Sequence, residues 1–167
     1  MGEPGDERGA GDKGTGVPLN LLGTHRHALD DKRRVAVPKA FREAVEAAGQ
    51  GEGYVVCRSL GGDACLALYT VSGFQAALAK LEGMRDEVLG VGTKDVRAYL
   101  RKVHMSATTA VLDRQGRITL RDDQCQLAGI DREVVFVGVG GSAEIWAPER
   151  LDADDQDFGS LAQRIFA

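Results

Sequence analysis

The fold of this chain is decided by a stretch that occurs twice, LDDKRRVAV at residues 29–37 and LDRQGRITL at residues 112–120. The two stretches share leucine, aspartate and arginine at their first, second and sixth positions, and they are offset by a constant 83 residues. An aspartate at such a position accepts hydrogen bonds from backbone N–H groups two residues further along a turn. Each stretch therefore predicts a tight β-hairpin whose outgoing strand begins with the arginine, Arg34 or Arg117.

The segments that follow the two stretches also correspond in order. Each stretch runs into a short helix-like segment closed by a glycine, then an apolar strand, a glycine turn, and a final strand ending in an aromatic residue, Tyr69 or Trp146. A unit of about 45 residues is too small to bury a core of its own. We therefore predict that the two units share one core.

This order predicts an α+β fold, mainly β, with two repeats, a helix after each hairpin and helices between the repeats. The expected organisation is a disordered Gly-rich leader at 1–20, a first repeat at 21–70, connecting helices at 71–105, a second repeat at 106–150 and an acidic C-terminal tail at 151–167.

Composition narrows the class of protein. The chain has 167 residues, of which 43% are apolar and 28% charged, so wholesale disorder is excluded. It has no apolar run long enough for a membrane span, and three unevenly spaced cysteines predict no disulfide framework and a reducing cytosol. The net charge of −4 opposes a nucleic-acid partner at first sight. Residues 1–20 carry −2 and residues 149–167 carry −3, however, which leaves +1 for residues 21–148.

The positive charge of that central part is densest at the first hairpin, where Lys32, Arg33 and Arg34 are consecutive; the second hairpin has Arg114 and Arg117. A rigid hairpin that begins a strand with arginine can present a planar guanidinium to a phosphate or to a guanine edge. The alternative is a local aspartate–arginine pair that only stiffens the hairpin, by less than about 1 kcal/mol where exposed. We favour the DNA-binding interpretation for the first hairpin and leave both open for the second.

Three segments together resemble the MraZ family of the SpoVT-AbrB superfamily: LDDKRRVAVPKAFREAV, SATTAVLDRQGRITL and LAGIDREVVFVGVGGSAEIW. The resemblance spans about residues 22–150. It implies two swapped-hairpin AbrB-like repeats that form an internal pseudo-dimer barrel. It also assigns Arg34 and Arg117 as the motif arginines, Asp30 and Asp113 as their orienting partners, and Lys32 as the motif lysine.

The same resemblance implies a function and partners. The family consists of sequence-specific DNA-binding transcriptional regulators that bind tandem short repeats in the promoter of the division and cell-wall gene cluster, including their own operon. The implied partners are double-stranded promoter DNA and further copies of the chain in a homo-oligomeric ring, with a cytoplasmic, nucleoid-associated location. No cofactor, metal, small-molecule ligand or membrane partner is expected.

Three residues depart from the family pattern. Arg33 occupies the glycine position of the first turn, where a positive φ would strain any other residue, so the hairpin tip is expected to be reshaped or of another turn type. Its added charge could strengthen or weaken phosphate contact. In the second repeat Arg121 replaces a proline and Gln124 an apolar helix residue, which leaves the packing of that helix open.

Other candidate sites are weaker. His25 and His27 lie far from His104 and predict no zinc site, and residues 137–141 resemble a dinucleotide loop but precede a strand rather than a helix. No nucleophile or metalloprotease motif occurs, so we expect no enzyme. The basic face of a helix predicted from residue 93 is taken as solvated, with contact to nucleic acid or to a neighbouring subunit as the alternative; it comprises Lys94, Arg97, Arg101 and Lys102.

The sequence therefore supports two functional hypotheses. The first is a sequence-specific DNA-binding regulator that uses the two hairpins. The second is an oligomeric interaction protein of the same fold with only weak, non-specific DNA binding, which the arginine in the glycine position of the first turn motivates.

Overall fold

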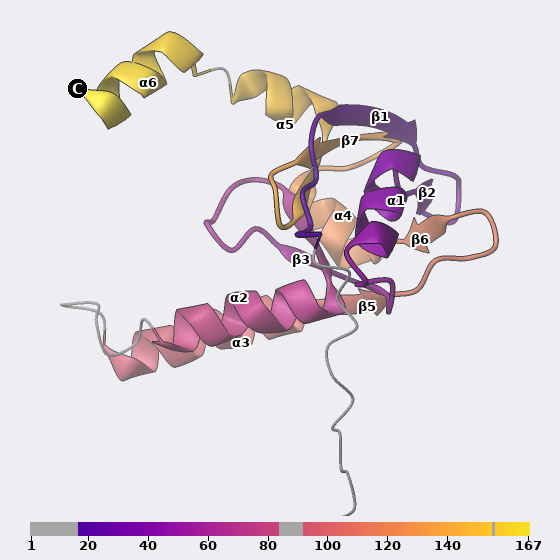
Figure 1. Ribbon diagram of the computed structural model, residues 1–167, viewed down its shortest axis with the longest axis horizontal. Coiled ribbons are helices and arrows are strands. Elements are labelled where there is room, and N and C mark those ends of the chain that lie inside the picture. Colours follow the sequence, from indigo (N-terminus) through magenta and orange to yellow (C-terminus); the bar gives the residue numbers. More distant parts are fainter. Residues whose placement is uncertain (1–16, 84–91, 155) are drawn as a thin grey trace, which may run out of the picture.

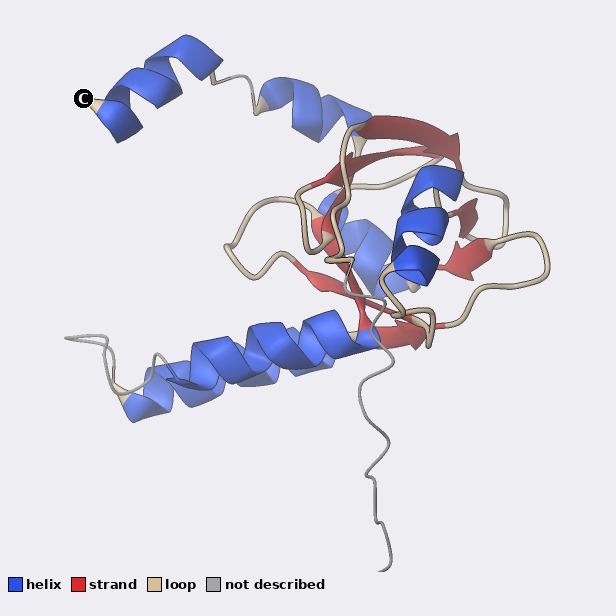
Figure 2. Ribbon diagram, viewed as in Figure 1, coloured by secondary structure: helices blue, strands red, loops and turns tan. Residues whose placement is uncertain are grey.

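A computed structural model describes residues 17–83, 92–154 and 156–167, and most of the predicted leader lies outside these residues. The fold is α+β and dominated by antiparallel strands (Figures 1 and 2). The strands are β1 (Thr24–Ala28), β2 (Arg34–Ala36), β3 (Tyr54–Arg58), β4 (Leu66–Thr70), β5 (Thr108–Ala110), β6 (Arg117–Thr119), β7 (Glu133–Gly138) and β8 (Ala143–Trp146). The helices are α1 (Lys39–Ala47), α2 (Val71–Gly83), α3 (Thr93–Ser106), α4 (Asp122–Ala128), α5 (Pro148–Ala153) and α6 (Phe158–Phe166).

The strands form a six-stranded sheet of order β1-β7-β8-β4-β3-β5 and a two-stranded ribbon of β2 and β6. The predicted closed barrel is wrong for the described part of the chain. The sheet ends at β1 on one side and β5 on the other, and the β2–β6 ribbon does not join these two edges because its strands pair only with each other.

The strand pairing has a twofold pattern. Val35 pairs directly with Ile118, its equivalent 83 residues later, at the centre of the β2–β6 ribbon. Ala67 pairs with Glu144, its equivalent when the closing aromatic residues Tyr69 and Trp146 are aligned, where β4 and β8 meet at the centre of the sheet. On either side of that centre, β7 is the equivalent of β3 and β1 is the equivalent of β5, so each side of the sheet contains strands from both halves of the chain.

One hydrophobic core serves both halves of the sequence, as predicted. Val35, Val37, Phe41 and Val45 from the first half are each 1% exposed. They belong to the same cluster as Ile118, Leu120 and Ala128, their equivalents 83 residues later, and as Cys125 of the second half.

Two pairs of helices project from this body. Helices α2 and α3 lie side by side and extend away from the sheet, and α2 has no buried side chain (Figure 1). Helices α5 and α6 occupy the stretch expected as an acidic tail; α5 contacts β7, and α6 leads away from the body. Among the described residues, no helix is long and apolar enough to cross a membrane.

Gln124 accounts for the packing of α4 that the sequence left open. Its side chain is 1% exposed, at the position where the first half has Phe41. The Nε2 atom donates to the carbonyl oxygens of Ser106 (2.8 Å) and Val56 (3.2 Å) and to Thr108 Oγ1 (3.0 Å). Its Oε1 accepts from the backbone N–H of Arg121 at 3.0 Å. The buried amide is thus fully used, and it fixes α4 against β3 and β5.

Replacing Gln124 by methionine is expected to lower the free energy of unfolding by about 1–3 kcal/mol, because buried carbonyl groups lose their donor while the volume is kept. Urea unfolding followed by circular dichroism measures this change. Gln126→Met, at an exposed position of the same helix, is the control and should change stability by less than about 0.5 kcal/mol. Equal destabilisation by the two variants would contradict this role for Gln124.

Candidate nucleic-acid interface

The β2–β6 ribbon separates its side chains into a buried face and an outer face. Val35 and Ile118 point into the core and are each 1% exposed. Because successive side chains of a strand point to opposite faces, their neighbours along the strands lie on the outer face. These neighbours are Arg34, Ala36, Arg117 and Thr119. Both motif arginines therefore lie on the outer face of one short ribbon.

Asp30 holds the first hairpin together. Its Oδ1 accepts from the backbone N–H groups of Lys32 (2.9 Å) and Arg34 (2.8 Å), and its Oδ2 accepts from Arg34 Nε at 2.7 Å. The carboxylate therefore both closes the turn and fixes the direction of the arginine. Within the described part of the chain, the two terminal nitrogens of Arg34 have no hydrogen-bond partner.

Asp113 repeats this geometry in the second hairpin. It accepts from the backbone N–H groups of Gln115 (2.8 Å) and Arg117 (2.9 Å), and from Arg117 Nε at 2.8 Å. The equivalence is incomplete in one respect, since Arg117 Nη1 also lies 3.5 Å from Asp30 Oδ2. Asp30 therefore faces both motif arginines and brings them together on the ribbon.

Both carboxylates stay charged at neutral pH. The hydrogen bond from the backbone N–H of Arg34, with help from its side chain, lowers the pKa of Asp30. The backbone N–H and side chain of Arg117 lower the pKa of Asp113 in the same way. Because a lowered pKa means that the folded hairpin favours the ionised form, these bonds weaken only when the pH falls through the lowered pKa values in strong acid.

Arg33 does not reshape the first turn, so that expectation is wrong. Its φ is 56°, in the region of Gly116 (φ 75°) at the equivalent position of the second turn. The backbone hydrogen bonds of the two turns also match: Arg33 N to Asp30 O is 3.0 Å, and Gly116 N to Asp113 O is 3.0 Å. The first turn therefore accepts a strained residue and keeps its type.

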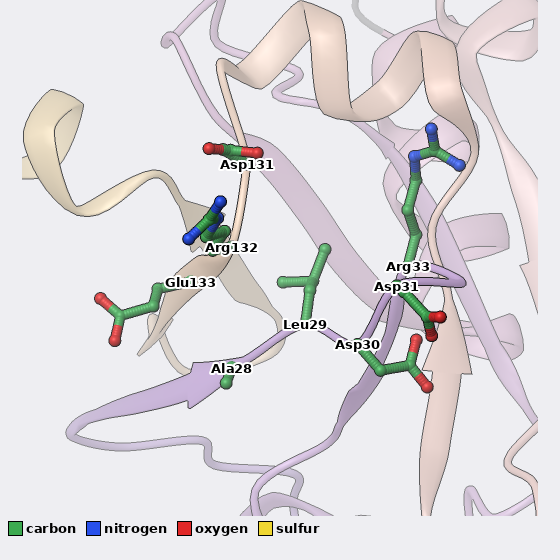
Figure 3. A pocket seen from close by; sticks show the side chains of 8 residues that line it. All are labelled: Ala28, Leu29, Asp30, Asp31, Arg33, Asp131, Arg132 and Glu133. Carbon is green, nitrogen blue, oxygen red and sulfur yellow. The ribbon is translucent and has the colours of Figure 1, made fainter.

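The side chain of Arg33 is engaged within the protein. Its Nη1 lies 2.5 Å from Oδ1 of Asp122, the first residue of α4. Figure 3 shows the guanidinium pointing away from the carboxylates of Asp30 and Asp31. This ion pair crosses between the two halves of the chain, and no sequence pattern predicted it.

Replacing Arg33 by glycine is expected to raise the free energy of unfolding by about 0.5–1 kcal/mol, because glycine adopts a positive φ without strain. The lost ion pair with Asp122 is exposed and offsets only a small part of this gain. Thermal and urea unfolding test the change. Lys32→Gly, one residue earlier in the turn at a position without positive φ, should destabilise the protein instead. A loss of stability in Arg33→Gly would show that Asp122 contributes more than the strain costs.

The remaining predicted residues lie at the tips of the two hairpins. Lys32 and Arg114 are exposed and form no ion pair with another described residue. Among the described residues, the structure thus provides two oriented arginines on the outer face of the ribbon, one at each end, two cations without an ion pair at the hairpin tips, and Arg33 bound to Asp122.

Arg42 of α1 is a neighbour of this surface that the sequence analysis missed. Its Nε donates to the carbonyl oxygen of Val37 at 3.2 Å, and its guanidinium packs on Gly116, where an added Cβ would lie 2.9 Å from Cζ. The Arg42 side chain thus supports the second turn from α1.

A hollow of about 580 Å³ lies beside the first hairpin (Figure 3). Its charged lining consists of the four carboxylates of Asp30, Asp31, Asp131 and Glu133 and the two guanidinium groups of Arg33 and Arg132. An excess of carboxylates repels phosphate, so this hollow is not suited to bind a phosphate group. The described residues contain no group of His, Cys, Asp and Glu side chains arranged to hold a metal ion.

Comparison with known proteins gives several curated relatives. The chain is 39% identical over 149 residues to the transcriptional regulator MraZ of Thermomicrobium roseum, which covers 87% of this chain and 96% of the relative. It is 35% identical over 144 residues to the MraZ of Symbiobacterium thermophilum (86% of this chain, 96% of the relative). It is 36% identical over 145 residues to that of Syntrophomonas wolfei (87% and 93%). No protein-family model matches the chain.

With such relatives, the chain falls in the class of transcription regulators. The chain belongs to the MraZ family. Like the relatives, which are named transcriptional regulators, it is not an enzyme.

Proposed function

We propose that the chain binds promoter DNA sequence-specifically by placing the β2–β6 ribbon and its two hairpins in the major groove. The observation that supports this most is the pair of arginines, Arg34 and Arg117, held through Nε by Asp30 and Asp113 on the outer face of the ribbon. The major groove admits a two-stranded ribbon, and an oriented guanidinium can donate to guanine O6 and N7 together. Fixing the side chains beforehand lowers the entropy lost on binding.

The proposed contacts divide into two kinds. Arg34 and Arg117 contact base edges, because they lie on the outer face of the ribbon between the two hairpin tips. Lys32 and Arg114 contact phosphates, because they are exposed at the tips and unpaired among the described residues. Arg33 would have to exchange Asp122 for a phosphate, and we assign it the smaller share of the phosphate contact.

The finer organisation is also part of the proposal. The pairing of Val35 with Ile118 and of Ala67 with Glu144 supports two swapped-hairpin repeats, at 21–70 and 106–150, that form an internal pseudo-dimer. We propose that several copies assemble in a ring at the nucleoid and bind tandem short repeats upstream of their own operon, in the division and cell-wall gene cluster. Each protomer contributes a weak contact, and the linked contacts add by effective concentration.

Binding to the DNA upstream of the chain's own gene tests the proposal. Fluorescence anisotropy at several salt concentrations should show tighter binding to this DNA than to a shuffled sequence of equal length, with both affinities falling as salt rises. Equal affinity for the two DNAs, in a protein that still assembles, would favour the alternative function, an oligomeric interaction protein with non-specific DNA binding.

A further inference from the structure

Helix α6 exposes an apolar face that no described residue of its own chain covers. Phe158, Ile165 and Phe166 are 83%, 71% and 85% exposed, and no residue of α6 is buried. Phe158, Leu161, Ala162 and Ile165 follow the three- and four-residue spacing that places side chains on one face of a helix. Figure 1 shows α6 well separated from α2 and α3. An exposed face of this kind marks an interaction surface.

A second apolar surface lies on the α2–α3 pair. A groove of about 430 Å³ runs between these helices and the outer strand β5, lined by Phe74, Leu78, Val55 and His104 among others. Although α2 is 13 residues long and carries apolar residues on one side, none of its residues is buried. Among the described residues, no further layer of structure covers the α2–α3 pair, and one amphipathic helix would supply such a layer.

The charges beside these two surfaces are complementary. The outer side of α3 carries Lys94, Arg97, Arg101 and Lys102, all exposed and without an ion pair to another described residue. The segment that leads into α6 is acidic, with exposed Glu149, Asp152, Asp154 and Asp157. A helix seated in the groove would bring its acidic leader next to the basic side of α3.

We propose that α6 of one copy docks in the α2–α3 groove of a second copy, with its acidic leader against the basic face of α3. This interface rests on the assembly in the proposed function and names the surfaces that make it. A head-to-tail contact between two different surfaces leaves each copy with one free groove and one free α6, so it continues from copy to copy and closes in a ring where the rotation allows.

Cross-linking between two differently tagged variants identifies the interface. One variant is Leu78→Cys in the groove and the other is Ile165→Cys on α6; the three native cysteines are buried and serve as background in the wild-type chain. A short bis-maleimide should link the two variants to each other in a mixture. A third sample is a chain that carries both substitutions. If a link forms only within that chain and not between the two mixed variants, or if no link forms at all, the proposal is overturned.

Assembly measured by light scattering separates this inference from the proposed function. Ile165→Glu should raise the concentration needed for assembly by roughly tenfold or more, since it places a charge in an apolar contact. Gln163→Glu, on the polar side of the same helix, should leave it unchanged. Arg97→Glu with Arg101→Glu should weaken assembly, and Asp152→Lys with Asp154→Lys should restore it.

If all variants assemble as the wild type does and still bind the promoter, α6 docking is wrong and the proposed function stands. If the wild-type chain is a monomer that binds promoter DNA, both the docking and the ring are wrong and only DNA binding remains.

Discussion

Arg34→Ala is expected to weaken binding to the chain's own promoter DNA by about 10- to 100-fold per protomer contact and to remove the preference over shuffled DNA. A bidentate arginine–guanine contact discriminates by about 1–3 kcal/mol, and each 1.4 kcal/mol corresponds to about tenfold in affinity. Because linked protomers bind together, the loss in an assembly exceeds that of one contact. The affinity of Arg34→Lys for the promoter should lie between those of the wild type and Arg34→Ala, since lysine keeps the charge but lacks the planar pair of donors.

The dependence of DNA binding on salt concentration distinguishes a base contact of Arg34 from a phosphate contact. Loss of a base contact lowers the ratio of specific to shuffled binding and leaves the salt slope unchanged. Loss of a phosphate contact instead weakens binding to all sequences and reduces the slope by about one. Arg26→Ala is the control, because Arg26 is an exposed arginine in an ion pair with Glu133, on β1 and outside the ribbon. If Arg34→Ala binds with the wild-type affinity and slope, the proposed role of the ribbon is wrong.

The hairpins could be predicted from the sequence because their determinants are local. Asp30 and Arg34 are four residues apart, as are Asp113 and Arg117, and the hydrogen bonds that orient each arginine are made within its own turn. The repeat also predicted the shared core, because a unit of about 45 residues is too small to bury a core of its own.

The contacts between the two halves could not be predicted in the same way. The ion pair of Arg33 with Asp122 and the packing of Arg42 on Gly116 depend on how α4 and α1 cross the opposite turn. Sequence spacing carries no information about such crossings. The barrel was wrongly expected for the same reason. Strands β2 and β6 pair with each other across the two halves of the chain, and spacing along the sequence does not predict this pairing.

These crossing contacts explain how one turn accommodates Arg33. In the second turn, Gly116 leaves room for the guanidinium of Arg42 from α1. The position of α4 equivalent to Arg42 is Cys125, which is small. Burial raises the pKa of its thiol, and the nearby guanidinium of Arg33 partly opposes this rise. Each turn–helix contact thus contains one arginine, supplied by the helix in one case and by the turn in the other.

Gly116→Arg is accordingly expected to lower the free energy of unfolding by about 2–4 kcal/mol. A non-glycine residue at φ 75° costs about 1–3 kcal/mol. The new Cβ would also lie 2.9 Å from Cζ of Arg42, which must move. In addition, the new guanidinium would face Arg42 and also Lys39, which stands at the position of the second half's Asp122.

Adding Arg42→Cys and Lys39→Asp to Gly116→Arg copies the Arg33 contact into the second turn and should restore all but about 1 kcal/mol of the loss, the strain that Arg33 itself carries. Urea unfolding measures the stability of Gly116→Arg, of the triple variant and of Arg42→Cys. All are compared at one fixed protein concentration, since assembly would otherwise shift the apparent stability. Arg42→Cys alone should cost about 1 kcal/mol through the lost hydrogen bond to Val37. If the triple variant is no more stable than Gly116→Arg, the arginine in the first turn is tolerated for another reason, and the exchange of arginines between turn and helix does not explain it.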